Sequence, residues 1–176
     1  MSVIAFLGLG GNLGQPKQTI RQVLAMLNEH PEIQVMAVSG FYRTKPVGMA
    51  PTDSGEVPWF TNSVAEIRCD LPALQLLALC MDIEQQLGRD RSPSENKNAG
   101  AHSRTIDIDL LFYGDEIIHQ PGLIVPHPRL HQRVFVLQPL SELAPDFQHP
   151  ELRLTVLELA RQLSIDQIAK EALYYA

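Results

Sequence analysis

Residues 104–113 read RTIDIDLLFY, in which polar and apolar side chains alternate up to Leu110. This alternation is typical of a half-buried β-strand, because successive side chains of a strand point to opposite faces. It places Asp107 and Asp109 together on one face, with Arg104 opening the same strand. Two carboxylates held this close favour a bound cation, since each otherwise raises the pKa of the other. Such hard oxygen ligands suit Mg²⁺ or Mn²⁺, with phosphate oxygens completing the shell. The alternative is a solvated strand face that carries two charges.

The chain before this strand predicts three further strands and two helices. The strands are expected at residues 3–9, 33–44 and 59–68, where apolar, β-branched and aromatic side chains gather. The helices are expected at residues 16–30 and 71–87. The first strand should end in a glycine-rich turn, Asp70 should cap the second helix, and Gly88 should end it.

Two loops and a last helix complete the expected elements. Residues 45–57 contain Pro and Gly and predict a long loop. Residues 89–103 are polar and predict a mobile loop, which we expect to order over the substrates. Residues 154–168 predict a final surface helix.

The order strand, helix, strand, strand, helix, strand predicts an α+β fold class. We expect a ferredoxin-like core with a mainly antiparallel sheet flanked by helices, in three α-β-α layers. The pattern alone also permits a doubly wound parallel sheet, but the strand pair before the second helix favours the antiparallel one. The length of 176 residues is that of one domain, so residues 1–176 are expected to form a single unit.

Composition excludes several classes of protein. The formal net charge of −6 argues against a nucleic-acid-binding surface, which normally carries a basic excess. Cys69 and Cys80 lie outside any Cys-x-x-Cys pattern, so a reducing cytosol fits and both cysteines should be small buried residues. The N-terminus lacks the basic region of a signal peptide, and no apolar run approaches the ~20 residues of a membrane span. We therefore expect a cytoplasmic protein that binds neither nucleic acid nor membranes.

The aspartate strand, as Arg-x-x-Asp-x-Asp-Leu-Leu, resembles the signature of the 6-hydroxymethyl-7,8-dihydropterin pyrophosphokinase family. Five further segments resemble that family in the same order, and together they make the resemblance specific. They are LGLGGNLG (7–14), FYRTKPVG (41–48), PWFTNSV (58–64), IEQQLGRDR (83–91) and VPHPRLHQRVF (125–135). The resemblance covers about four-fifths of the chain and implies an enzyme of folate biosynthesis.

The resemblance implies a pterin pocket. A pterin is a flat bicycle with a polar rim, so it binds between aromatic faces with hydrogen bonds around its edge. The implied substrate-binding residues are two rings, an amide, two main-chain groups and a loop residue: Phe60, Phe135, Asn62, Thr44, Val47 and Asn12. Taken alone, the two phenylalanines would be ordinary core residues, and residues 8–13 would be a tight turn that fails the dinucleotide fingerprint.

The resemblance also implies an ATP site. Leu77, Glu84 and Leu110 are expected on the nucleotide side, and Arg89 and Arg91 at the base of the mobile loop are expected to reach the phosphates. Without the resemblance, these two arginines would be favourable partners of a helix carboxyl end.

His127 and Arg133 resemble phosphate contacts of the family. The spacing of His127 and His131 also fits zinc ligands on a helix, but no third ligand is evident.

The implied reaction transfers the β,γ-pyrophosphoryl group of ATP to the hydroxymethyl oxygen of the dihydropterin and releases AMP. Asp107, Asp109, Arg89 and Arg104 are the expected catalytic residues. The two aspartates would hold two Mg²⁺ ions that orient the triphosphate and offset its charge. Partners would be the small molecules ATP and a dihydropterin, and we expect a monomer.

Three other functions stay open. Gly100 and His102 depart from the family pattern before Arg104, so a non-catalytic relative that senses a pterin or a nucleotide is one alternative. Such a sensor would gain nothing from both aspartates. A second is another Mg²⁺-dependent phosphotransferase with a different acceptor, and a third is an interaction module without metal-dependent ATP binding.

Overall fold

The computed structural model describes residues 2–46, 58–88, 103–163 and 174–175. Before the segment of residues 89–103, its elements are β1 Val3–Gly11, α1 Pro16–Glu29, β2 Ile33–Val38, β3 Tyr42–Thr44, β4 Phe60–Cys69 and α2 Ala73–Gln86. After it come β5 Asp107–Tyr113, β6 Ile118–Gln120, β7 Leu123–Val125, the 3₁₀ turn η1 Leu130–Gln132, α3 Val134–Leu143, α4 Val156–Gln162 and β8 Tyr174–Tyr175. None of the helices in these ranges combines the length and apolar composition needed to cross a lipid bilayer.

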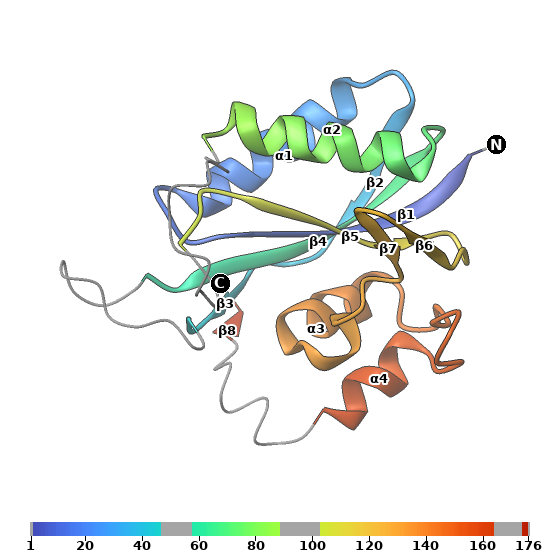
Figure 1. The fold of residues 1–176 in the computed structure, drawn as a ribbon. Helices are drawn as coiled ribbons and strands as arrows, with labels where there is room; N and C mark the ends of the chain where they lie inside the picture. Colours follow the sequence, from blue (N-terminus) through green and yellow to red (C-terminus); the bar gives the residue numbers. More distant parts are fainter. Residues whose placement is uncertain (1, 47–57, 89–102, 164–173, 176) are drawn as a thin grey trace.

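One sheet organises the molecule, with strand order β5-β1-β4-β3-β8 and β2 also pairing with β4 (Figure 1). Every strand pair in this sheet is antiparallel. The prediction of a mainly antiparallel sheet flanked by helices is confirmed, and the parallel alternative is wrong.

Helices cover both faces of the sheet. Figure 1 shows α1 and α2 on one side and α3 with α4 on the other. Two clusters of buried side chains correspond to these sides, one joining the sheet to α1 and α2, the other joining it to α3 and α4. Burial of these apolar surfaces is the main force that holds the helices to the sheet.

The predicted strands are present, but their ends differ. β1 continues to Gly11, so most of the glycine-rich segment is strand rather than turn. Residues 33–44 are two strands, not one, and side chains take part in the hydrogen bonds at the break. Val64 N–H donates to the Ser39 hydroxyl at 2.9 Å, and Gly40 N–H donates to the Glu142 carboxylate at 2.9 Å.

The two predicted long helices are confirmed, with one correction. Helix α1 buries Ile20, Val23 and Leu27, which form an apolar stripe at helical spacing. Helix α2 begins after Pro72, and Asp70 does not cap it. The residue before a proline disfavours helical backbone, so the helix cannot start at Leu71. Gly88, with φ of 87°, follows the end of α2 as expected.

Both cysteines are buried and free, as predicted. Cys69 lies on β4 and Cys80 on α2. Burial raises the pKa of Cys69, and it raises the pKa of Cys80 to about 12. Both shifts disfavour the thiolate, which is the nucleophilic form of cysteine.

The last predicted helix is shorter than expected. α4 starts after Thr155, whose side chain accepts the Glu158 N–H while the Glu158 carboxylate accepts the Thr155 N–H, a capping box. Leu163 is extended and ends the helix, and residues 164–168 lie outside the described residues. Val156 and Leu159 are buried, so one face of α4 belongs to the core.

We expect His149 to make the stability of the α4 region sensitive to acid. His149 is 3 % exposed, and its Nδ1 accepts the N–H groups of Glu151 at 3.3 Å and Leu152 at 3.2 Å. Burial lowers the pKa of His149 from its usual 6.5, so the folded protein favours the neutral ring. The stability that comes from the neutral His149 ring is fully present above the pKa of His149 in the unfolded chain. It is lost as the pH falls from that pKa towards the lower pKa of His149 in the folded protein.

The corresponding measurement is urea unfolding at pH values from 7 down to 5. His149→Asn keeps a side-chain acceptor but does not titrate, so its free energy of unfolding should fall less steeply with acid than that of the wild type. Identical pH slopes in the two proteins would contradict this role of His149.

Candidate active site

The two aspartates lie where the sequence pattern places them, at the start of edge strand β5. Asp107 and Asp109 are half-buried, and Ile106 and Ile108 are buried. β5 pairs with β1, which sets Gly10 opposite Asp107 and Gly8 opposite Asp109. The predicted alternation is confirmed, so both carboxylates share one face of the strand.

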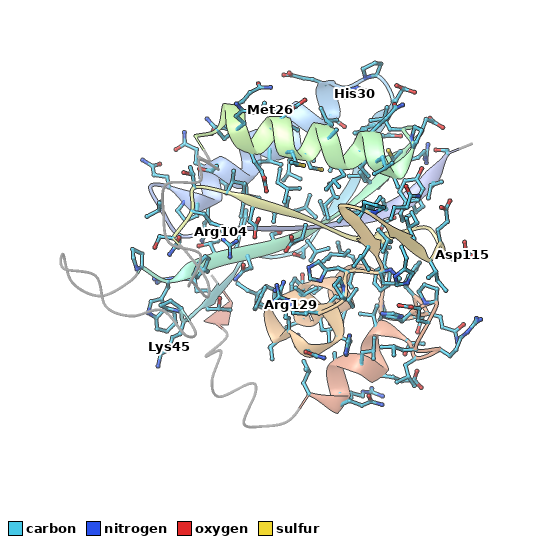
Figure 2. The ribbon with its side chains drawn as sticks, in the orientation of Figure 1. Met26, His30, Lys45, Arg104, Asp115 and Arg129 are labelled. Atoms are coloured by element: carbon cyan, nitrogen blue, oxygen red, sulfur yellow. The ribbon has the colours of Figure 1, made fainter. Side chains whose placement is uncertain are left out.

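Arg104 and Arg133 each form an ion pair with one of these aspartates. Arg104 Nη1 lies 2.6 Å from Asp107 Oδ2, and Arg133 Nη1 lies 3.7 Å from Asp109 Oδ2. Figure 2 shows Arg104 at the end of the sheet where β5 begins. Arg104 precedes β5 rather than opening it, which corrects the expected start of the strand.

The same two arginines stack on the two predicted pterin-binding rings. The Arg104 guanidinium lies 5.6 Å from the ring centre of Phe60, and that of Arg133 lies 5.4 Å from the ring centre of Phe135. Each arginine therefore joins one carboxylate to one aromatic face. Phe60 is buried on β4, whereas Phe135 is half-buried in the first turn of α3.

The predicted polar rim is built on β3 and β4. Thr44 lies opposite Phe60 in the strand register, and Asn62 Nδ2 donates a hydrogen bond to Thr44 Oγ1 at 2.9 Å. Gly10 on β1 lies opposite Asn62, and a Cβ there would stand 2.7 Å from Asn62 Oδ1. The missing side chain of Gly10 thus makes room for the amide.

Asn12 joins three segments around the site. Its side-chain amide donates to Pro58 O at 3.1 Å and to Ser103 Oγ at 3.2 Å, and its Oδ1 accepts the Arg104 N–H at 2.8 Å. Asn12 is 4 % exposed. It ties the end of β1 to the chain just before β4 and just before β5, and so fixes Arg104 beside Asp107.

We expect Gly11→Ala to lower kcat by more than its loss in free energy of unfolding would explain. A Cβ at Gly11 would stand 2.3 Å from the Thr105 carbonyl oxygen, which is main chain and cannot rotate away. Relieving the clash should cost about 1–3 kcal/mol and move Arg104. Urea unfolding and kcat would be compared with those of Gly8→Ala, where the new methyl meets only the Leu111 side chain at 3.4 Å. Equal effects of the two variants on kcat would contradict the prediction.

The residues expected on the nucleotide side come from α2 and β5. Leu77 is partly buried on α2, and Leu110 is buried on β5. Glu84 is 1 % exposed, and its Oε1 accepts the Ile108 N–H at 2.7 Å. The structure thus joins Glu84 to the aspartate strand through its main chain.

His127 contributes a neutral ring near the arginines. Burial, with Arg133 and Arg129 next in importance, lowers the pKa of His127 to about 4. Its Nδ1 accepts the Arg129 N–H at 3.2 Å, which leaves the proton on Nε2 as a hydrogen-bond donor. The bond to Nδ1 also opposes zinc binding there. Burial lowers the pKa of Arg133 as well.

The carboxylate pair fits a divalent cation with few protein ligands. Within the described ranges, no group of three or more His, Cys, Asp or Glu side chains is placed to hold a metal. Mg²⁺ is commonly bound by one or two carboxylates, with water and substrate phosphates as the other ligands. Asp107 and Asp109 offer that donor set, and Arg104 and Arg133 balance its charge.

A family model described as 7,8-dihydro-6-hydroxymethylpterin-pyrophosphokinase (HPPK) matches residues 6–145. The chain belongs to the HPPK family. All of the proposed site residues, from Asn12 to Phe135, fall inside the matched range, whereas α4 and β8 fall outside it.

Two relatives named 2-amino-4-hydroxy-6-hydroxymethyldihydropteridine pyrophosphokinase support this membership. The Bacillus subtilis protein is 39 % identical over 143 residues, which cover 81 % of this chain and 79 % of the relative. The Haemophilus influenzae protein is 33 % identical over 168 residues, which cover 96 % of this chain and 98 % of the relative.

Solved structures share the fold of this HPPK-family chain. Wild-type Plasmodium falciparum HPPK-DHPS with pteroate superposes with a TM-score of 0.69 at 17 % identity, over 92 % of this chain and 42 % of that one. Its A437G variant with STZ-DHP gives a TM-score of 0.70 at 15 % identity, over 92 % and 45 %. This chain therefore spans less than half of those chains, and the likeness concerns the fold.

Some expected site residues of this HPPK-family chain lie outside the described residues. They are Val47, Arg89 and Arg91, together with Gly100 and His102, which depart from the family pattern. Sequence reasoning gave no role to Trp59, which lies next to Phe60. The Arg43 guanidinium lies 5.3 Å and the Lys45 ammonium 5.7 Å from the Trp59 ring centre. Lys45 follows β3 at the edge of the molecule (Figure 2).

Proposed function

We propose that the protein transfers pyrophosphate from ATP to 6-hydroxymethyl-7,8-dihydropterin, giving AMP and the pterin diphosphate in folate biosynthesis. Family membership supports the reaction. The structural observation that carries the proposal is the pair of arginines, each of which joins an aspartate to an aromatic ring. Acceptor and donor sites would then meet at Arg104 and Arg133. Product analysis with both substrates tests the proposal directly.

The pterin would bind between Phe60 and Phe135. Asn62 and the main chain of Thr44 and Val47 would bond to its rim, and Asn12 would hold the pocket wall. The Asn62 side chain is anchored by Thr44 and accommodated by Gly10, so its amide is held in one orientation. A preorganised amide loses little conformational entropy when the ligand binds.

Phe135→Ala is expected to weaken pterin binding far more than ATP binding. Loss of one stacking face should cost roughly 1–3 kcal/mol, by analogy with stacking of nucleic-acid bases on aromatic side chains. Fluorescence titration with the pterin, and with an ATP analogue as reference ligand, measures both affinities. Phe147→Ala removes a ring from the same side of the sheet, away from the site, and controls for loss of core packing. Equal weakening of both ligands in Phe135→Ala would contradict the assignment.

The nucleotide would bind on the other side of the aspartates. Leu77 and Leu110 would lie near the base, Glu84 on the same side, and His127, Arg133 and Arg91 near the phosphates. The neutral His127 ring suits this role, because its Nε2–H can donate to a phosphate oxygen without changing charge. The planar guanidinium of Arg133 can donate two hydrogen bonds to one phosphate, and it already lies close to Asp109.

Asp107 and Asp109 would hold two Mg²⁺ ions. Bound Mg²⁺ would supply positive charge that offsets the triphosphate and the developing negative charge of the transition state. The residues of the chain would orient the reactants: the hydroxymethyl oxygen attacks the β-phosphorus, the bond from that phosphorus to the α,β-bridging oxygen breaks, and AMP leaves with the bridging oxygen. The hydroxyl proton goes to solvent.

Arg104 and Arg133 would change partners when ligands bind. In the structure their guanidinium groups balance the two carboxylates and cover two ring faces. Cations bound to the aspartates and a pterin bound to the rings would displace both contacts. The arginines would then turn to the phosphates, where Arg104 and Arg89 would act as catalytic residues.

The finer description of the molecule is also part of this proposal. A ferredoxin-like core in three α-β-α layers is supported by the antiparallel order β5-β1-β4 with β2 and by helices on both faces. We further propose one domain over residues 1–176 that acts as a monomer in the cytoplasm.

A sensor that binds the same ligands without catalysis is the second candidate. Both functions use Phe60, Asn62 and Phe135, so binding alone does not separate them. A sensor would bind pterin and nucleotide in stoichiometric amounts but release no AMP. The presence of both aspartates on the half-buried face of β5 favours the enzyme.

A further inference from the structure

Glu84 is a buried carboxylate with a main-chain partner. It lies on α2 among the buried residues Leu76, Cys80 and Ile83, and is itself 1 % exposed. Burying a carboxylate is costly unless hydrogen bonds replace its water. Its Oε1 accepts the N–H of Ile108 at 2.7 Å, the short distance typical of an N–H bonded to a carboxylate.

This hydrogen bond occupies the outer edge of β5. Main-chain N–H groups of an antiparallel strand alternate between its two edges. Among the described strands, β1 is the neighbour of β5 in the main sheet, so the Ile108 N–H bonded to Glu84 points away from β1. Glu84 thus takes the place of a neighbouring strand at this residue.

Ile108 stands between the two aspartates of the proposed metal site. The main chain of Asp107 and Asp109 faces β1 at Gly10 and Gly8, while Glu84 holds Ile108 from the opposite edge. The strand is therefore fixed on both edges at the three residues that set the separation of the two carboxylates. An edge strand without such a partner would be free to fray or twist at this point.

We propose that Glu84 is a positioning residue, which holds the Asp107–Asp109 segment in the geometry that binds the metal. This inference rests on the proposed metal role of the aspartates. It gives Glu84 a different task from direct contact with the nucleotide. Groups that orient metal ligands typically change metal affinity by 10–100-fold when removed, so an effect of about that size is expected.

Three variants of Glu84 separate the positioning role from a direct contact with the nucleotide. Glu84→Met fills the same space but removes the acceptor, Glu84→Asp keeps the charge but shortens its reach, and Glu84→Gln keeps an acceptor of the same length. Glu158→Met is the matched control, because Glu158, on α4, also accepts a main-chain N–H at 2.7 Å, from Thr155 just before that helix.

Two measurements report on the proposal without turnover. The first is Mn²⁺ affinity in the presence of a non-hydrolysable ATP analogue, with AMP affinity in chelator as the reference. The second is hydrogen exchange of the Ile108 amide by NMR, without metal or nucleotide. Glu84→Met should bind Mn²⁺ about 10–100-fold more weakly and exchange the Ile108 amide faster, with unchanged AMP affinity. Glu84→Asp should show the weaker Mn²⁺ binding and the faster exchange to a smaller degree. Glu84→Gln and Glu158→Met should resemble the wild type in Mn²⁺ affinity and in exchange of the Ile108 amide.

The possible results distinguish failure of the positioning role from failure of the proposed metal site. Wild-type Mn²⁺ affinity in both Glu84→Met and Glu84→Asp would overturn the proposal, as would loss of AMP affinity in chelator, which would make Glu84 a nucleotide contact. If Glu84→Met does not fold, Glu84→Asp against Glu84→Gln carries the same comparison. Absence of Mn²⁺ binding by the wild type would instead overturn the metal site of the proposed function, and the Ile108 exchange would still report on the hydrogen bond.

Discussion

Asp107→Ala and Asp109→Ala are each expected to lower kcat by about a thousandfold, which corresponds to roughly 4 kcal/mol of transition-state stabilisation. Each variant removes one carboxylate from the pair on β5 and leaves its ion-pair partner, Arg104 or Arg133, uncompensated beside the substrate. Charge stabilisation by a bound metal matters most in the transition state, so the loss should appear in kcat rather than in pterin affinity.

Steady-state kinetics and pterin titration of the two variants test this expectation. Asp115→Ala is the matched control, since Asp115 is an exposed aspartate in the turn after β5. It should keep the wild-type kcat, and all three variants should keep the wild-type circular dichroism. A loss below about tenfold in both Asp107→Ala and Asp109→Ala would mean that the metal is held elsewhere.

Removal of divalent cations is expected to abolish AMP formation, and added Mg²⁺ should restore it. The expected ligand set is two carboxylates with water and phosphate oxygens, which is open enough for a chelator to withdraw the metal. The fold should survive chelation, because Arg104 and Arg133 can balance the charge of the aspartates with which they pair. Pterin binding should also survive, since the ring and amide contacts are made by the protein alone.

The rate of AMP formation across a Mg²⁺ titration in chelator buffer measures the effect. Chelation should add little to the defect of Asp109→Ala, because the two changes remove the same interaction. Full activity in excess chelator would show that catalysis does not use a divalent cation.

The parts of the fold that follow from local pattern were predictable. The alternation at Asp107 and Asp109 and the stripe of Ile20, Val23 and Leu27 are imposed by burial of one face, which repeats with the period of a strand or a helix. The antiparallel pairing of β4 with β2 and β3 was also expected, because a loop and no predicted helix joins these strands, whereas parallel neighbours usually need a helical crossover.

The element ends that were wrong depend on contacts distant in sequence. The break after β2 is stabilised by Val64 and Glu142, and the late start of β5 by Asn12, which accepts the Arg104 N–H. Asp70 resembled a helix cap, but the proline at position 72 delays the helix. Local propensity does not include such partners.

The candidate site likewise combines features that the sequence predicted with features that it did not. The residue types were read from the motifs, but their coupling was not: nothing in the sequence indicates that Arg104 covers Phe60 or that Arg133 covers Phe135. Glu84 was singled out by its motif, whereas its bond to the main chain of Ile108 depends on the packing of α2 against β5.

The most direct test of the central claim is the stoichiometry of products from ATP, Mg²⁺ and 6-hydroxymethyl-7,8-dihydropterin, resolved by chromatography. ATP labelled at the γ-phosphate should pass its label to the pterin, with one AMP released for each pterin diphosphate and with AMP release about a thousandfold slower in Asp109→Ala. Stoichiometric ADP, which signals transfer of a single phosphoryl group, or binding of both substrates by the wild type with no AMP at all, would contradict it.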